Sequence, residues 1–395
     1  MRALEKTTAI TGVGHSQLGR KLGRSGLDLT VEAALRAMEH AGLDRRDIDG
    51  VVTWPGRSET GSPGMGPVGC IEVKEALGLE LNWYFSGPEG PAQTSSLMMA
   101  VMAVATGVAR HVLCFRTLTE SSSQTPERRA SVQGSGSDRV AERFGYMTPY
   151  KAYSAAIWLA LVAQRRVHEF GLTRDQLGQI ALNGRRNAAL NPEAIMRHAL
   201  SLDDYLAARM ISEPLCLLDC DIPMDGSTCV IVSHIDAAKD LRRPPLRIEA
   251  MSGAIRGRAD WVQYEDLTSM AARDAAAGLW KRTDLKPKDV DIAELYDGFS
   301  IITLCWLEAL GFCGRGESGA FIEGGQRIAR DGELPLNTNG GQLSAGRMHG
   351  FGLLEEACLQ LWGEAGERAV ARPPRVAVVA NGGGPLASCL LLARD

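Results

Sequence analysis

A glycine-rich stretch near the C-terminal end carries two side chains that could take part in chemistry. Residues 337–357 read NTNGGQLSAGRMHGFGLLEEA, and Arg347 and His349 lie there between Gly346 and Gly350. Glycine lets the backbone approach a ligand closely, and the helix predicted after Gly350 would direct its N-terminus, which attracts anions, to the same place. The stretch therefore predicts an anion-tolerant site, with an ordinary strand-to-helix turn and exposed polar residues as the alternative.

Composition and charge exclude several classes of protein. The chain has 395 residues, of which 45% are hydrophobic and 23% charged, as in ordinary soluble globular proteins. The net charge of −4 argues against broad binding to nucleic acids or anionic membranes, which needs a basic surface. No apolar run approaches the roughly 20 residues of a membrane span, so we expect no membrane association.

The nine cysteines do not have the paired spacing of a zinc site. Cys216 and Cys220 lie close together, but no second pair completes a set of four ligands. We therefore expect buried free thiols and no metal. The odd count and the absence of a signal peptide favour the reducing cytoplasm.

Two internal repeats indicate how the elements around these groups are organised. The segment from Leu29, LTVEAALRAMEHAGLDRRDIDGVV, is echoed from Leu267, so that Asp47-Ile48-Asp49 aligns with Asp289-Val290-Asp291. A second echo joins residues 95–115 to residues 353–380, each a helix, a turn with Gly and a basic residue, and an apolar strand. Halves that alternate strands and helices in this way predict a duplicated α/β unit.

The apolar pattern breaks at Arg242-Arg243-Pro244-Pro245, where the second half is expected to begin. The first half is predicted at residues 1–240, including a loop region at about 116–215, and the second at residues 241–395. Within the loop region, residues 121–140 are polar and rich in Gly and Ser, which predicts a surface loop.

The phrase LPLNTNGGQLSAGRMHGFG at residues 334–352 resembles the C-terminal signature of the thiolase superfamily. Aligned on the glycines, Gly346 is the first glycine of the loop that shapes the acyl-CoA site, and Arg347 replaces the thiolase catalytic histidine. The His349-Gly350 pair is similar to the lipid-transfer-protein branch, which includes the aldolases of steroid side-chain breakdown. The resemblance covers residues 9–392 and implies the thiolase fold, two similar halves in a five-layered αβαβα arrangement.

The resemblance also implies that both thiolase cysteines are missing. The nucleophile position falls on Gly90, which would leave room for an acyl chain, and Glu89 is the titratable group on that turn, as a base or as a solvated carboxylate. The acid/base position falls on Asn381, which can donate a hydrogen bond but cannot move a proton at neutral pH. We expect the backbone N–H groups of Gly382 and Gly383 to help bind an oxyanion, with a tight loop as the alternative.

The motif LYDGF at 295–299 resembles the YDxF motif of the lipid-transfer-protein branch, where the tyrosine is a proposed acid/base. The ordinary pKa of a phenol is near 10, so Tyr296 would need a nearby cation, for which Arg347 or a protonated His349 is available. The alternative is a core tyrosine with a satisfied hydroxyl. Two departures from the aldolases stand out: Arg347 replaces a second tyrosine, and Gly298 replaces a histidine.

These residues favour aldol-type cleavage or formation of a C–C bond in a β-hydroxyacyl-CoA, which needs no cysteine. The alternatives are a catalytically degenerate acyl-CoA-binding or scaffold subunit and, more weakly, an acyltransferase. Coenzyme A is expected as part of the substrate, with no permanently bound cofactor. The resemblance further implies a homodimer through the strand around Val112 to Phe115 and a small partner with an OB fold and a zinc ribbon.

Overall fold

The computed structural model describes residues 3–57, 62–87, 90–124, 146–150, 152, 154–256 and 260–394. Glu89 and residues 125–140 of the expected surface loop lie outside this part of the chain. Among the described residues, no helix is long and apolar enough to cross a membrane.

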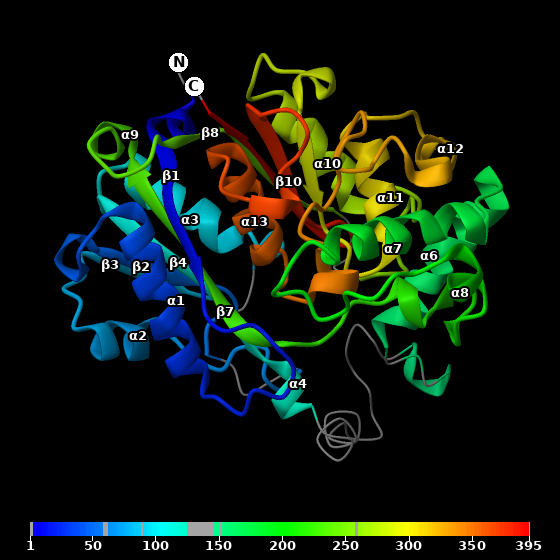
Figure 1. Ribbon diagram of the computed structural model, residues 1–395, viewed down its shortest axis with the longest axis horizontal. Coiled ribbons are helices and arrows are strands. Elements are labelled where there is room, and N and C mark those ends of the chain that lie inside the picture. Colours follow the sequence, from blue (N-terminus) through cyan, green and yellow to red (C-terminus); the bar gives the residue numbers. More distant parts are fainter. Residues whose placement is uncertain are drawn as a thin grey trace.

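The described strands form one large mixed sheet and a short ribbon (Figure 1). The large sheet contains β1 (Thr8–His15), β2 (Gly50–Thr53), β3 (Trp83–Ser86), β4 (His111–Thr119), β7 (Asp225–His234), β8 (Leu246–Ile255), β9 (Ile292–Leu295), β10 (Val376–Gly382) and β11 (Leu386–Ala393). Their order is β3-β2-β4-β7-β1-β8-β11-β10-β9, and β5 (Met210–Ser212) pairs with β6 (Leu215–Cys216) in the separate ribbon.

The order of the strands displays the repeat that the sequence predicts. On one side β2 and β4 are parallel and β4 is antiparallel to β7; on the other, β9 and β10 are parallel and β10 is antiparallel to β11. Asp49 and Asp291 perform the same task in each half. Asp49 accepts the backbone N–H groups of Arg110 and His111, and Asp291 accepts those of Arg375 and Val376.

The two half-sheets meet where β1 pairs with β8, through Ala9 with Arg247 and Ile10 with Leu246. The two stacked halves that the resemblance implies are joined at this short contact into one continuous sheet. Such a short pairing lets the twisted sheet turn over on itself, so its two halves face one another.

Helices on both faces of the half-sheets make the five layers. The longer helices are α1 (Gly26–Ala41), α2 (Cys70–Leu77), α3 (Ser95–Ala105), α10 (Met270–Trp280), α11 (Ser300–Ala309) and α13 (Phe351–Trp362). Val112 and Cys114 of β4 pack in one cluster with α3 and α13, and so do Ala377 and Val379 of β10. The alternate residues of β4 face α1 and α2, and those of β10 face α10 and α11. Helices α3 and α13 therefore form the central layer (Figure 1).

The remaining described helices are short or belong to the loop region. They are α4 (Glu120–Ser123), α6 (Ala155–Phe170), α7 (Arg174–Ala188), α8 (Leu202–Leu206), α9 (Ile235–Ala238) and α12 (Ser318–Ile322). Helix α7 matters for the site because Asn183 and Asn187 donate to the carbonyl of Leu336, at 2.9 and 3.0 Å. Asn191, just beyond it, donates to the carbonyl of Asn339 at 2.9 Å. The loop region thus binds the backbone that leads into the glycine-rich stretch.

The strand expected to form a dimer interface lies inside the sheet. β4, which contains Val112 and Phe115, pairs with β2 on one side and β7 on the other, and both residues are fully buried. It therefore has no free edge for a second molecule. The free edge of that half-sheet is β3, where Tyr84 and Phe85 are 56% and 39% exposed.

Candidate active site

Two parallel strands bring Tyr296 and Asn381 to the same end of the second half-sheet. β9 ends at Leu295, β10 ends at Gly382, and the N–H of Tyr296 donates to the carbonyl of Ala380 at 2.9 Å. The loop before α13 closes against them. A Cβ atom on Gly350 would lie 1.5 Å from Oδ1 of Asn381, so the side chain of Asn381 rests against a glycine backbone.

Asp297 fixes the shape of the glycine-rich stretch. Its carboxylate accepts the N–H of Gln342 at 2.8 Å within a single π-turn at Gly341–Ala345. A Cβ atom on Gly341 would lie 1.9 Å from Oδ2 of Asp297, so this carboxylate needs a glycine beside it. Burial raises the pKa of Asp297 to about 6. The role of Asp297 is therefore to hold the turn that precedes Arg347.

The first half contributes Gln93, just before α3. Its Nε2 lies 3.4 Å from the hydroxyl of Tyr296. Gly90, to which the sequence assigned the place of the nucleophile, lies against Ser95 and Trp54 instead, since an added Cβ would meet Ser95 Oγ at 2.5 Å. The residue that faces the tyrosine from this helix entrance is thus Gln93, which the sequence analysis missed.

His349 is buried and adopts a left-handed backbone conformation, with φ +47°. Nη2 of Arg116, from β4, donates to its Nδ1 at 2.6 Å, and because guanidinium only donates, the proton of the neutral ring lies on Nε2. Burial, and then the charges of Arg116 and Arg347, lower the pKa of His349 well below its usual range. A protonated His349, which we considered as the cation beside Tyr296, is therefore disfavoured.

Arg347 is held between two carboxylates. It contacts Oε2 of Glu120 through Nε and Nη2 at 2.9 and 2.7 Å, and Oδ1 of Asp221 through Nη1 at 2.9 Å. Although burial lowers the pKa of Arg347, Asp221 and Glu120 raise it above the usual value, so this side chain stays charged. Its charge is matched by these two anions and is not left free for a substrate.

Tyr296 is 8% exposed and keeps its phenol proton. Burial raises the pKa of its hydroxyl, Asp221 raises it further, and Arg347 lowers it in part. Asp221 was not found from the sequence, because a single acidic residue in LLDCDIP has no pattern that marks it. Burial raises the pKa of Asp221 to about 7, against the opposing effect of Arg347.

Asn381 is fully buried, and both polar atoms of its amide lack a hydrogen-bond partner among the described residues. Trp54 Nε1, Gln93 Oε1 and Arg116 Nε share this property. Contacts link these groups, because Arg116 lies over the ring of Trp54 at 5.6 Å and Gln93 reaches Tyr296. Buried donors and acceptors are rarely left unpaired, so this group has the properties of a site for a polar substrate.

Three of the expected oxyanion and substrate residues make other contacts. The N–H of Gly383 donates to the carbonyl of Leu386 at 3.0 Å within the turn between β10 and β11, so it is not available to an oxyanion. The carbonyl of Gly382 accepts the indole N–H of Trp306 at 3.0 Å. Gly346 faces Met224, whose sulfur an added Cβ would meet at 2.5 Å.

The thiols near this site are poor nucleophiles. Cys220 precedes Asp221, and burial, then Asp219, raise the pKa of its thiol to about 12. Its sulfur turns to the carbonyl of Cys216 at 3.6 Å. Cys114 is buried in the core, where burial raises the pKa of its thiol well above the usual value. The described part of the site therefore presents no thiolate, which covalent thiolase chemistry requires.

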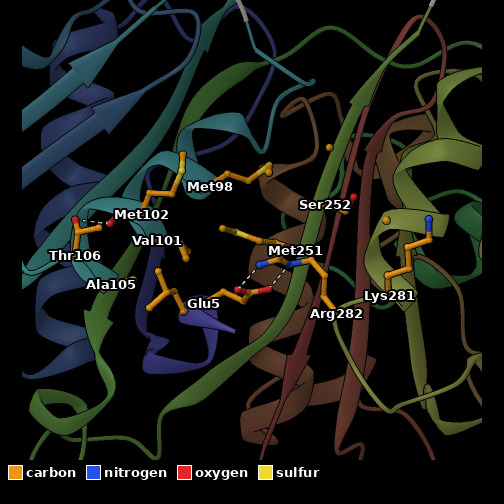
Figure 2. A pocket seen from close by; sticks show the side chains of 13 residues that line it. Glu5, Met98, Val101, Met102, Ala105, Thr106, Met251, Ser252, Lys281 and Arg282 are labelled. Atoms are coloured by element: carbon orange, nitrogen blue, oxygen red, sulfur yellow. Dashed lines mark hydrogen bonds and ion pairs between the residues drawn. The ribbon is translucent and has the colours of Figure 1, made fainter. Parts of the chain in front are cut away.

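A separate groove of about 610 Å³ lies between α3, β8 and α10 (Figure 2). Met98, Met102 and Met251 line it, and the ion pair between Glu5 and Arg282, with Nη2 and Oε2 2.7 Å apart, lies at its wall. None of Tyr296, His349, Arg347 or Asn381 belongs to its lining, so it is distinct from the site described above.

Known proteins share this fold and much of this sequence. A family model described as "Thiolase C-terminal domain-like" matches residues 253–392. The steroid side-chain-cleaving aldolase of Thermomonospora curvata is 34% identical over 90% of both chains. The 17-hydroxy-3-oxo-4-pregnene-20-carboxyl-CoA lyase of Mycobacterium tuberculosis is 34% identical over 98% of this chain and 100% of its own.

A solved structure, the Ltp2-ChsH2(DUF35) aldolase, matches with a TM-score of 0.87 and 32% identity over 99% of each chain. The similarity in sequence and fold thus extends over nearly the whole chain. The chain therefore belongs to the thiolase superfamily, to the sterol-carrier-protein or lipid-transfer-protein branch that the steroid side-chain aldolases share.

Proposed function

We propose that this protein is an acyl-CoA lyase, which cleaves a C–C bond of a β-hydroxyacyl-CoA by aldol chemistry and forms it in the reverse direction. The observation that carries the proposal is a buried, protonated Tyr296 in a described site without a thiolate. Claisen chemistry of the thiolase kind needs a nucleophilic cysteine, and aldol cleavage does not. The printed names of two relatives that are 34% identical, an aldolase and a CoA lyase, support the same reaction class.

The reaction assigns a task to each group. A base takes the proton of the β-hydroxyl, the Cα–Cβ bond breaks as a carbonyl forms, and the electron pair moves into the thioester as an enolate, which is then protonated at Cα. Tyr296 would contact the hydroxyl. The amide of Asn381 and the Nε2–H of His349 would donate to the enolate oxygen. Arg347 would keep Glu120 and Asp221 in position, and coenzyme A enters as part of the substrate.

The test is the release of an aldehyde or ketone from a β-hydroxyacyl-CoA by wild type and by Tyr296→Phe. General acid–base groups contribute about 10²–10⁴-fold, so a loss of that order in kcat is expected. Stability should change by only about 1 kcal/mol, the worth of one neutral hydrogen bond. Tyr150→Phe, at a residue that is 83% exposed, is the matched control.

Two results would contradict the proposal. Full activity in Tyr296→Phe would remove Tyr296 from the mechanism. Acyl-CoA binding without cleavage by the wild type, also with a partner added, would favour a carrier or scaffold subunit.

We also infer a homodimer and a small OB-fold partner with a zinc ribbon. The exposed aromatic edge at β3 supports the dimer, and a solved relative whose name joins Ltp2 to ChsH2(DUF35) supports a partner. A tagged wild-type chain should retain a small cysteine-rich protein from the lysate of its own organism. A lysate that yields no such protein, and activity that needs none, would contradict the second inference.

A further inference from the structure

The phenol of Tyr296 lies directly over Gly298. A Cβ atom on Gly298 would meet Cε1 of Tyr296 at 2.6 Å and its hydroxyl oxygen at 3.3 Å. Any side chain at residue 298 would therefore displace the ring. Glycine here lets the hydroxyl lie on the side of the site where Asp221 and Arg347 are found.

Asp221 is joined to the same glycine. Its backbone N–H donates to the carbonyl of Gly298 at 3.1 Å. Arg347 donates to Oδ1 of Asp221 at 2.9 Å, and the described residues give Oδ2 no hydrogen bond. Of the charged groups near Tyr296, Asp221 has the largest effect on the phenol. A carboxylate oxygen without a donor thus lies within electrostatic reach of the catalytic hydroxyl.

The other charged groups around Asp221 cannot perform the same task. Glu120, from α4, also binds Arg347, and its Oε1 accepts from Gln124 at 3.0 Å. Asp297, after β9, is used by the backbone N–H of Gln342. His349 is occupied by Arg116 at Nδ1. Among these described charged groups, this leaves Asp221 as the carboxylate with an oxygen that accepts no hydrogen bond.

We propose that Asp221 is the proton-holding partner of Tyr296, which accepts the proton that the substrate hydroxyl gives up through the phenol. This rests on the proposed aldol function. As the β-hydroxyl loses its proton to the oxygen of Tyr296, the phenol passes its own proton to Oδ2 of Asp221 through one bridging water, since the two side chains make no direct hydrogen bond in the structure. The Cα–Cβ bond then breaks, and the electron pair enters the thioester as an enolate. The proton returns through Tyr296 to Cα, which restores both residues with no other reagent.

The acidity of Asp221 suits this task. Burial raises its pKa to about 7, and although Arg347 lowers it, Glu120 and Asp297 raise it further. Near neutral pH the carboxyl group is therefore present in both forms, as a group that accepts and returns a proton should be. Asp221 acts through Tyr296 and is a positioning and relay residue, so its test needs a readout beyond activity alone.

The experiment measures kcat and kcat/KM for cleavage of a β-hydroxyacyl-CoA between pH 5.5 and 9. For the wild type, kcat/KM should rise with pH with a midpoint near 7. Asp221→Asn should lose about 10²–10⁴-fold in kcat, with KM little changed, and should lose that rise. Asp221→Glu keeps a carboxylate, so it should be more active than Asp221→Asn. Its kcat/KM should again rise with pH, with a midpoint that differs from that of the wild type.

Asp219→Asn is the matched control, two residues earlier. Asp219 is fully buried, and Tyr205 and Ser300 donate to its carboxylate at 2.8 and 2.5 Å, so its role is structural. Asp219→Asn should lower the stability of the fold and leave the midpoint of the rise of kcat/KM with pH unchanged. Gly298→Ala gives an independent test, because it displaces the phenol and should lower kcat as Tyr296→Phe does.

The outcomes separate the two proposals. Cleavage by the wild type together with an unchanged pH rise in Asp221→Asn would overturn the role of Asp221 alone. Asp221→Glu as inactive as Asp221→Asn, with both folded, would also overturn it. A wild type that releases no carbonyl product at any pH would instead overturn the proposed function.

Discussion

At the scale of single residues, burial decides which groups carry charge in this site. Arg116, Arg347, Glu120, Asp221 and His349 lie close together with little access to water. Burial disfavours the charged form of any ionisable side chain. Arg347 stays charged because two carboxylates contact it, whereas burial, and then the charges of Arg116 and Arg347, lower the pKa of His349 and keep its ring neutral. The neutral ring can then offer its Nε2–H as a donor.

A depressed histidine pKa has a consequence for stability. The unfolded chain takes up a proton on His349 as the pH falls below about 6.5, and the folded chain resists it, so stability is lost with falling pH in that window. Between pH 6.5 and 5, the free energy of unfolding should fall less in His349→Asn than in the wild type. Asparagine tolerates the positive φ and can accept from Arg116, so folding should be retained. Urea unfolding at pH 8, 6.5 and 5 measures this.

The value at pH 8 serves as the internal control for that experiment, since there the histidine is neutral in both states. The free-energy difference between wild type and variant at pH 8 reports the change in packing. Parallel curves for the two proteins down to pH 5 would mean that His349 titrates normally and would contradict its assignment as a neutral donor.

At the scale of elements, the two ends of α13 carry glycines with similar φ angles and different roles. Gly350 precedes the helix at φ +83° and Gly363 follows it at φ +75°. Around Gly363 a Cβ atom would meet nothing within 4 Å, but at Gly350 it would overlap Asn381. The C-terminal glycine only ends the helix, while the N-terminal one also makes room for a site residue.

Replacement of each glycine by alanine should separate these roles. Gly363→Ala should cost roughly 1–2 kcal/mol, the strain of a left-handed residue. Gly350→Ala should cost more, by about 1–3 kcal/mol for overpacking, and should abolish activity. When Asn381→Ala is combined with Gly350→Ala, it should restore part of the lost stability. Combined with Gly363→Ala, it should restore none. A double-mutant cycle measured by urea unfolding tests both expectations. Equal costs for the two glycines would show that the contact with Asn381 is unimportant.

At the scale of the whole molecule, the duplicated sheet explains why the site contains residues from both halves. The central helices α3 and α13 occupy corresponding places in the two halves, and their N-terminal ends meet between the half-sheets. Gln93 and His349 come from these two ends, and Tyr296 comes from the end of β9. The division of the halves near residue 240 remains a prediction, which the connection between β7 and β8 supports.

The sheet also leaves one aromatic edge uncovered, and this leads to a prediction on assembly. If a second copy pairs with β3, the double variant Tyr84→Lys, Phe85→Lys should shift the protein from dimer to monomer, because lysine on an edge strand opposes strand pairing. Light scattering at micromolar concentration measures the mass. Leu161→Lys, at an exposed leucine of α6, should leave the mass unchanged. A wild type that is already monomeric would contradict the dimer.

The sequence by itself determined the features that local patterns record. The repeat around Asp49 and Asp291 predicts the duplicated fold, because the same short pattern of a helix, a turn and a strand recurs in both halves of the chain. The resemblance places Gly90 and Asn381 at the two cysteine positions and so predicts that this chain does not use the covalent chemistry of thiolases, which needs a thiolate. The LYDGF motif marks Tyr296 because it resembles the YDxF motif of the lipid-transfer-protein branch, in which the tyrosine is a proposed acid/base.

The tertiary structure alone decided which distant groups meet and which of them are charged. Gln93, Arg116, Glu120 and Asp221 lie 75 or more residues from Tyr296 in the chain, and none has a pattern of its own that marks it. The prediction that the dimer forms through the strand at Val112 to Phe115 was wrong for the same reason. An apolar strand has the same sequence pattern whether it lies in the centre of a sheet or at its edge. Proton affinities depend on burial and on charges a few ångströms away. Those quantities exist only after folding brings the segments together.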